Sequence, residues 1–299
     1  MVNPLNVLKS IRHNIYYYLC PDKIYLGRMY KSIFGKKINW KNPTTFNEKL
    51  NWLKIYNRRP EYTRMVDKYE VKKYVADIIG DKYVIPTFGV WNHFNDIDFD
   101  KLPEQFVLKC THDSGGLVIC RDKSKLDKES VSQKIDASLK RRYYYVGREW
   151  PYKYVKPRIL AEKYVENHIN VSDNNKFQSD SLPVYKFFCF NGRPKMVQVI
   201  MNDKLPNETV DYFDMDWNHL NIRQVYDNCK FTLNKPAAFD KMKEIAAKLC
   251  ENQLFIRVDL YEVNGNVLFS EFTFYSDCGF GIFEPENIDI ELGKELLIN

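Results

Sequence analysis

One stretch of the chain combines residue types that could bind phosphate. It reads Phe106-Val-Leu-Lys-Cys-Thr-His-Asp-Ser-Gly-Gly116. Alternation along a strand would place Lys109 on the same face as Val107, and the adjacent glycines would let backbone N–H groups close around an anion. This pattern is typical of a phosphate cradle, although a common Gly-Gly turn beside a solvated lysine would have the same sequence.

A second stretch places four polar residues on two strands joined by an Asn-Gly turn. Arg257 and Asp259 share a strand face, as do Glu271 and Thr273 on the next strand, because residues two apart point the same way. Carboxylates brought together repel unless they hold a cation, and oxygen ligands of this kind suit magnesium. An ion pair between Arg257 and Glu271 without metal is the alternative.

Shared binding of magnesium requires Asp259 to lie opposite Glu271. A two-residue turn at Asn264-Gly265 followed by regular pairing would instead place Asp259 opposite Ser270 and direct Glu271 to the other face. We therefore expect an odd loop, most simply residues 264–266, or a bulge that gives the same result.

Helical patterns dominate the first 79 residues, and strand patterns follow. Thr45 and Glu48 form a capping box that begins one helix, and a second helix runs through Val66 and Tyr69 and stops at Gly80. Further helices are predicted around 131–139 and 242–249, and strands at 83–91, 106–110, 117–120, 159–165, 185–190, 195–201, 255–261 and 267–274. Hairpins separated by helices predict an α+β fold with antiparallel sheets.

Length and composition exclude several classes of protein. The 299 residues suggest about two domains, and 44% hydrophobic with 28% charged residues excludes a disordered chain. Seven scattered cysteines without a CxxC pair argue against a disulfide framework or a zinc site. The chain has neither a membrane-spanning run nor an apolar leader, so we expect a cytoplasmic protein. The polar segment 167–183 is the best internal division, which gives regions 1–79, 80–168 and 169–299.

The positive charge lies at the N-terminus. Residues 1–60 contain eight Lys and four Arg against Asp22 and Glu48, a net charge of 12 − 2 = +10, whereas the whole chain carries +6. A basic segment of this kind suits anionic lipid, a polyanionic polymer or nucleic acid, because charge alone does not identify the partner. Of these we expect peripheral contact with an anionic polymer or with the inner face of a membrane, and no nucleic-acid partner. A solvated helical surface is the alternative.

The order of the motifs along residues 40–290 resembles the ATP-grasp superfamily, and within it the TupA-like family. The motifs that carry this resemblance are Phe46-Asn-Glu-Lys-Leu50, Lys109-Cys-Thr-His-Asp-Ser-Gly-Gly116, Arg148-Glu-Trp-Pro-Tyr152, Tyr185-Lys-Phe-Phe-Cys-Phe-Asn-Gly192, Arg257-Val-Asp-Leu260 and Glu271-Phe-Thr-Phe-Tyr275. The family is named after a teichuronopeptide biosynthesis protein and is typical of bacterial capsule and cell-surface polysaccharide gene clusters. An ordered series of motifs is far more specific than any single one.

The resemblance implies two α+β lobes that clasp ATP after a basic helical N-terminal segment. The implied ATP contacts are Lys68, Lys109, Ser114, Gly115, Gly116, Glu162, Lys163 and Val165, the last three at adenine. The implied magnesium ligands are Asp259, Glu271 and Thr273, the last where the superfamily usually has Asn. Arg257 would face the transferred phosphoryl group, and Lys109 would hold the ATP phosphates. Lys186 would contact a phosphate or a carboxylate, with a plain surface lysine as the alternative. Val184 stands where an acidic residue often contacts the ribose.

The implied reaction is an ATP-dependent ligation of a carboxylate to an amine through an acyl phosphate. By the resemblance, an amino acid or amino alcohol would join a uronic acid, on a nucleotide- or lipid-linked sugar, in surface polysaccharide synthesis. A glycosyltransferase that binds metal through Asp214 and Asp216 is the alternative, and a basic membrane- or polymer-binding protein without activity is a third reading. His112 is equally consistent with a phosphate contact and with a structural loop residue.

Overall fold

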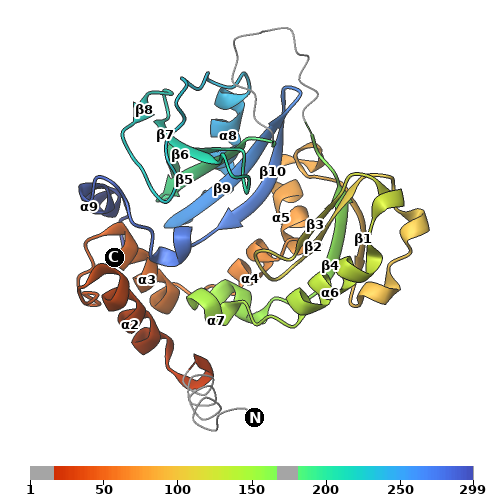
Figure 1. The fold of residues 1–299 in the computed structure, drawn as a ribbon. Helices are drawn as coiled ribbons and strands as arrows, with labels where there is room; N and C mark the ends of the chain where they lie inside the picture. Colours follow the sequence, from red (N-terminus) through yellow and green to blue (C-terminus); the bar gives the residue numbers. More distant parts are fainter. Residues whose placement is uncertain (1–16, 167–180, 299) are drawn as a thin grey trace.

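The computed structural model describes residues 17–166 and 181–298, which form two antiparallel sheets with helices packed around them (Figure 1). The four-stranded sheet has the order β1-β4-β2-β3, and the six-stranded sheet has the order β10-β9-β5-β6-β7-β8. The predicted α+β class with antiparallel sheets is confirmed. The division predicted at 167–183 lies almost wholly outside the described residues, as does the N-terminal part of the basic segment, residues 1–16.

The strands occur where alternation and turn residues predict them. The small sheet contains β1 (Thr87–Trp91), β2 (Phe106–Cys110), β3 (Leu117–Cys120) and β4 (Ile159–Lys163). The large sheet contains β5 (Val184–Phe190), β6 (Arg193–Met201), β7 (Thr209–Asp214), β8 (His219–Leu220), β9 (Phe255–Val263) and β10 (Asn266–Thr273). The strand predicted from residue 83 begins only at Thr87, because residues 81–83 form a 3-10 turn.

Helices cover both sheets. They are α2 (Asp22–Phe34), α3 (Phe46–Tyr56), α4 (Glu61–Val66), α5 (Glu70–Ile79), α6 (Lys128–Leu139), α7 (Tyr144–Gly147), α8 (Phe239–Leu249) and α9 (Asn287–Glu295). The capping box predicted for α3 is present, with Thr45 Oγ1 accepting the Glu48 N–H at 3.3 Å. None of the helices in the described ranges has both the length and the apolar character needed to cross a bilayer.

The single helix predicted through Val66 and Tyr69 is wrong, because the chain breaks between α4 and α5. Asp67 Oδ1 accepts the N–H groups of Tyr69 at 2.9 Å and Glu70 at 3.2 Å, as a residue that caps a new helix does. Arg158 Nη2 holds the other oxygen of Asp67 at 2.8 Å. The break leaves Lys68 outside regular helix.

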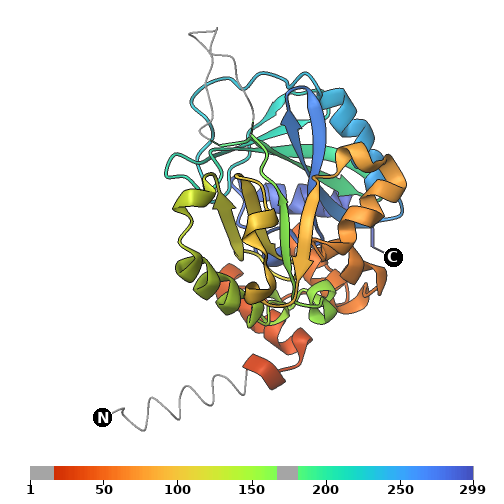
Figure 2. The same ribbon diagram turned by 90° about the vertical axis from the view of Figure 1, so that its right-hand side faces the viewer.

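Two buried clusters form the core. The larger one combines the six-stranded sheet with apolar residues of α3, α4, α5, α8 and α9, so these helices are fixed to that sheet. The smaller one joins β2 and β4 to Ile135 of α6. Figure 2 shows the four-stranded sheet in front, with the other sheet behind it. All seven cysteines are free thiols, and Cys110, Cys120, Cys189 and Cys250 are buried.

Candidate active site

The turn between β9 and β10 has two residues. Asn264 (φ 50°) and Gly265 (φ 77°) both take the left-handed conformation that a type I′ hairpin needs, and Val263 pairs with Asn266. The three-residue loop 264–266 that we expected is therefore wrong.

A bulge at Ser270 nevertheless places the two carboxylates together. Phe269 pairs with Leu260, and the next pair is Glu271 with Asp259, so Ser270 is the extra residue in β10. The bulge corrects the register by one residue, and the prediction that Asp259 lies opposite Glu271 is confirmed.

Arg257 binds the first of these carboxylates tightly. Its Nε and Nη2 donate to Oδ1 and Oδ2 of Asp259, each at 2.8 Å, and Nη2 also donates to Thr273 Oγ1 at 3.0 Å. Glu271 Oε1 lies 3.9 Å from Arg257 Nη2, and Lys186 Nζ lies 4.0 Å from Asp259 Oδ2. The main partner of Arg257 is thus Asp259, and not Glu271 as the alternative had it.

The electrostatics separate the two carboxylates. Burial raises the pKa of Asp259, although Arg257 and Lys186 oppose this rise. For Glu271 burial also favours the neutral acid, but Lys68, Arg257 and Lys186, together with Lys109, lower its pKa below the usual value. The Glu271 side chain is 47% exposed and therefore offers an ionised carboxylate to the space between the sheets.

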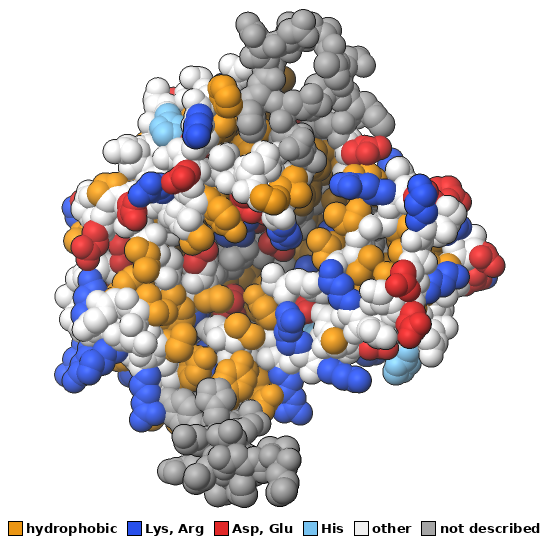
Figure 3. Space-filling model, viewed as in Figure 1, with side chains coloured by type: hydrophobic (Ala, Val, Ile, Leu, Met, Phe, Trp, Pro, Cys, Tyr) orange, Lys and Arg blue, Asp and Glu red, His pale blue; other side chains and the backbone are white. Residues whose placement is uncertain are grey.

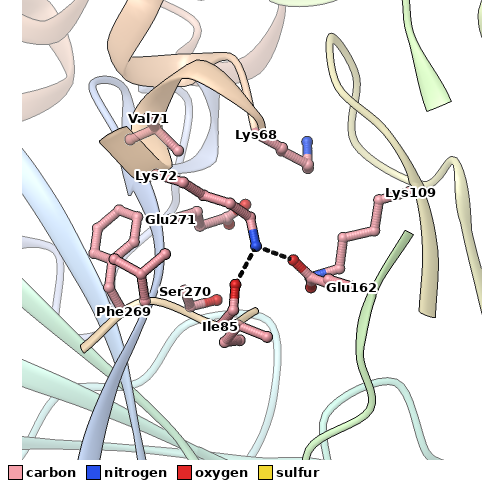
Figure 4. A pocket seen from close by; sticks show the side chains of 10 residues that line it. Lys68, Val71, Lys72, Ile85, Lys109, Glu162, Phe269, Ser270 and Glu271 are labelled. Atoms are coloured by element: carbon pink, nitrogen blue, oxygen red, sulfur yellow. Dashed lines mark hydrogen bonds and ion pairs between the residues drawn. The ribbon is translucent and has the colours of Figure 1, made fainter. Parts of the chain in front are cut away.

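Three lysines surround a pocket between the sheets (Figure 4). Lys68, Lys72 and Lys109 line it together with Glu162 and Glu271. Lys72 Nζ lies 2.9 Å from Glu162 Oε2, and Lys109 forms an ion pair with the other oxygen of that carboxylate. The side chain of Glu162, which the resemblance implied at adenine, is therefore the counter-ion of these two lysines. On the face shown in Figure 3 the surface is hollowed between the two sheets, with acidic and basic side chains around the hollow.

Lys72 is a site residue that the sequence reasoning missed. It lies in the first turn of α5, where its ammonium also donates to the carbonyl of Ile85 at 2.6 Å. Its position four residues after Lys68 was the available signal, since this spacing would bring two side chains to one face of the single helix predicted there, although Lys68 in fact precedes α5. The signal was incomplete because Glu162, which holds Lys72, comes from a distant strand.

The glycine loop between β2 and β3 is fixed by contacts on its inner side. Lys68 Nζ donates to the carbonyl of Asp113, and the Asp113 carboxylate accepts from Ser138 of α6. A Cβ at Gly116 would overlap the Ser138 hydroxyl, so only glycine fits there. Ser114 and Gly115 remain exposed at the tip, where their backbone can meet an anion.

His112 is held as a structural residue. It is buried, its Nε2 lies 3.0 Å from the carbonyl of Arg141, and burial lowers the pKa of its imidazole. The structure thus favours the structural reading of this histidine over a phosphate contact.

The remaining predicted residues have simpler surroundings. Lys163 is exposed, and its N–H donates to Pro86 at 2.9 Å, while Val165 is half-buried beside the undescribed segment. Asp214 Oδ1 accepts the N–H groups of Asp216 at 2.9 Å and Asn218 at 2.8 Å. Such a carboxylate stabilises a turn, which accounts for the DxD triplet without metal.

The donor set on β9 and β10 fits a hard cation. Each oxygen of Asp259 accepts one N–H from Arg257 and keeps a second lone-pair position, while Glu271 faces open space. No group of three or more His, Cys, Asp or Glu side chains in residues 17–166 and 181–298 could hold a metal. A magnesium ion here would therefore take its remaining ligands from phosphate and water oxygens.

The chain matches the sequence model of the TupA-like ATP-grasp family over residues 48–297. No curated protein sequence matches the chain. Among solved structures, D-alanine–D-alanine ligase from Helicobacter pylori is similar at 16% identity and a TM-score of 0.44, covering 84% of this chain and 69% of the ligase. The same enzyme from Bacillus anthracis, complexed with ATP, is 15% identical with a TM-score of 0.39, and the match covers 70% of this chain and 53% of the ligase. A RimK-domain ATP-grasp protein from Sphaerobacter thermophilus is 11% identical with a TM-score of 0.41, and the match covers 79% of this chain and 69% of that protein. The chain thus spans 53–69% of the length of these proteins.

Proposed function

The chain belongs to the TupA-like ATP-grasp family, and from this premise we propose that it is an ATP-dependent ligase that joins a carboxylate to an amine. The observation that carries the proposal is the convergence of Lys68, Lys72 and Lys109 with Glu271 around one pocket between the sheets, with Arg257 beside it, 3.9 Å from Glu271 Oε1. Cations fixed in this way stabilise the charge that moves during phosphoryl transfer.

The proposed reaction has two steps. A carboxylate oxygen attacks the γ-phosphorus of ATP and ADP leaves, which converts a poor acyl donor into an acyl phosphate. The amine nitrogen then attacks the acyl carbon, and phosphate leaves with the electrons of the broken C–O bond. Lys68 and Lys109 would hold the phosphates, and Arg257 would neutralise the transferred group. Magnesium, held by Asp259 and Glu271, would screen the negative charge of the triphosphate.

For the identity of the substrates, the proposal relies on the family to which the chain belongs. The carboxylate would be a uronic acid of a cell-surface polysaccharide precursor, on a nucleotide- or lipid-linked sugar, and the amine an amino acid or amino alcohol.

The test is a screen of carboxylate and amine pairs with ATP and magnesium, followed by mass spectrometry. A productive pair should release ADP and phosphate in equal amounts with the amide. Lys109→Ala should lower turnover by about a hundredfold or more, because one fixed charge at the phosphates is lost. Lys195→Ala, which removes a lysine paired with Glu295 on the surface, should leave turnover unchanged. Consumption of a nucleotide sugar without ADP release would contradict the proposal, and unchanged turnover in Lys109→Ala would contradict the phosphate site.

A further inference from the structure

Two loops beside Arg257 hold non-glycine residues in the left-handed conformation. Arg148 (φ 53°) ends α7 directly before Glu149. Asp277 (φ 49°) and Cys278 (φ 52°) lie in the turn that follows β10. Such conformations cost free energy and cluster at active sites and ligand-binding loops, although Lys204 and Trp217 adopt them elsewhere in this chain. The phosphate site described above uses neither loop.

One buried ammonium group holds the two loops together. Lys54 Nζ donates to the carbonyls of Gly147 at 2.7 Å and Cys278 at 2.5 Å, and to Asn51 Oδ1 at 3.3 Å. Burial lowers the pKa of Lys54 to about 8. Since these acceptors are the carbonyls of both loops, the position of Glu149 relative to Cys278 is fixed.

Glu149 is thereby placed near the reaction centre. Cys278 Sγ donates to Glu149 Oε1 at 3.2 Å, and Ser276, two residues before Cys278, lies 3.4 Å from Arg257 Nη1 through its hydroxyl. Burial raises the pKa of Glu149, while the positive charges of Lys54 and Arg257 act in the opposite direction. The Glu149 carboxylate is therefore close enough to Arg257, which is proposed to neutralise the transferred phosphoryl group, to be affected by its charge.

The second oxygen of Glu149 makes no hydrogen bond within the described residues, although the residue as a whole is buried, at 5% exposure. Because Oε2 is not among the fully buried atoms without a partner, part of it reaches the surface, where a ligand can meet it. Tyr143 and Tyr152 are close enough for the charge of Glu149 to raise the pKa of both phenols, and their rings lie edge to face at a centroid distance of 4.8 Å. A carboxylate beside aromatic rings is a favourable environment for an ammonium group, whose positive charge in turn favours the ionised form of the carboxylate.

We infer that Glu149 Oε2 binds the ammonium group of the amine substrate and accepts one of its protons. This inference rests on the ligase function proposed above. The ammonium nitrogen gives one proton to Glu149 and so gains the lone pair that attacks the acyl carbon. The C–N bond forms, the C–O bond to phosphate breaks, and the second nitrogen proton passes to the departing phosphate.

A purely structural role accounts less well for this arrangement. In the part of the chain that the structure describes, Lys54 donates to carbonyl oxygens and makes no ion pair with Glu149. Burial raises the pKa of the Cys278 thiol, so the sulfur acts as a hydrogen-bond donor to Glu149 and not as a nucleophile.

Two nucleophiles separate the role of Glu149 from the rest of the reaction. Hydroxylamine is uncharged near neutral pH and traps an acyl phosphate as a hydroxamate without needing a proton acceptor. In Glu149→Gln the rate of hydroxamate formation and the KM for ATP should be unchanged. The KM for the amine substrate should rise about tenfold to a hundredfold, since one charge-assisted hydrogen bond is lost. Glu291→Gln, which removes a surface carboxylate paired with Lys294, should change neither activity.

An unchanged KM for the amine in Glu149→Gln, or an equal loss of both activities, would overturn the inference. If Glu149→Gln does not fold, Glu149→Asp keeps the charge but withdraws it by one methylene, and the same separation of the two activities is expected. A wild-type protein that forms no hydroxamate with any carboxylate would instead contradict the proposed function. Calorimetric binding of the amine to wild type and variant would then decide the inference, which requires weaker binding in the variant.

Discussion

Replacing Glu162 by glutamine would test whether the lysine pair serves to bind phosphate. Glu162 is the buried carboxylate between Lys72 and Lys109, and glutamine keeps its shape but removes its charge. Without nucleotide, two ammonium groups would then face each other with no anion between them. A bound triphosphate would supply that negative charge, so nucleotide should stabilise Glu162→Gln more than it stabilises the wild type.

The expected size of the effect follows from the burial of the three side chains. Loss of one partner from a buried ion pair costs about 3–5 kcal/mol. The side chains of Lys72 and Lys109 are 14% and 22% exposed, so water screens part of the repulsion. We therefore expect a loss of about 2–4 kcal/mol in the free energy of unfolding, or about 3–6 °C in Tm for a chain of this length.

Thermal unfolding with and without saturating ATP and magnesium, in the absence of the other substrates, measures this effect. Glu162→Gln should unfold at lower temperature than the wild type without nucleotide, and the difference should shrink when nucleotide is present. Glu291→Gln is the matched control, since its exposed carboxylate lies in α9. Equal unfolding temperatures without nucleotide, or a difference that nucleotide does not reduce, would refute the argument that this ion pair belongs to a phosphate site.

Three further predictions concern pH, metal and charge. Burial opposes ionisation of Glu162, but Lys109 and Lys72 outweigh it and lower its pKa, so the stability that Glu162 provides is present above about pH 4.3 and is lost as pH falls through the lowered value. The difference in Tm between wild type and Glu162→Gln should therefore close in acid, and a difference that persists there would contradict the charge argument. Glu271→Gln should raise the magnesium concentration needed for half-maximal turnover, which a titration would measure, and an unchanged requirement would remove Glu271 from the metal site. If the exposed basic residues of the N-terminal segment bind anionic lipid, the fraction of protein that sediments with anionic vesicles should fall as salt rises past about 0.1 M. The double variant Lys36→Glu, Lys37→Glu should sediment with the vesicles less than the wild type. Binding that does not depend on salt would contradict this role and leave only a solvated basic surface.

The sequence predicted those parts of the fold whose causes are local. Strand alternation located β2 and β3 at the residues observed, and the capping box placed the start of α3, because these signals lie within a few residues of each other. The break between α4 and α5 has no such signal. Asp67 can cap α5 in any chain, but Arg158 lies 91 residues away and binds this carboxylate only in the folded protein.

The lysine pocket shows the same limit within the site. Lys68, Lys109 and Glu162 were predicted through a family resemblance, which orders residues along the chain but does not give their contacts. The ion pair of Lys72 with Glu162 joins α5 to β4, and only the packing of these elements brings the two charges together. The residues next to Lys72 in the sequence therefore could not show whether it lines the pocket or lies on the surface.

The hairpin of β9 and β10 shows where chemical reasoning reached further than local propensity. Asn264-Gly265 predicted a two-residue turn, and the structure has that turn. Regular pairing from it would have separated Asp259 from Glu271, whereas a shared cation requires the two carboxylates on one face. The two requirements are compatible only if the ladder gains one residue between the turn and the site, and Ser270 is that residue. The residues around Ser270 carry no local signal for a bulge, so local propensity could not predict it. The requirement that Glu271 lie opposite Asp259 is what predicted an irregularity in this hairpin.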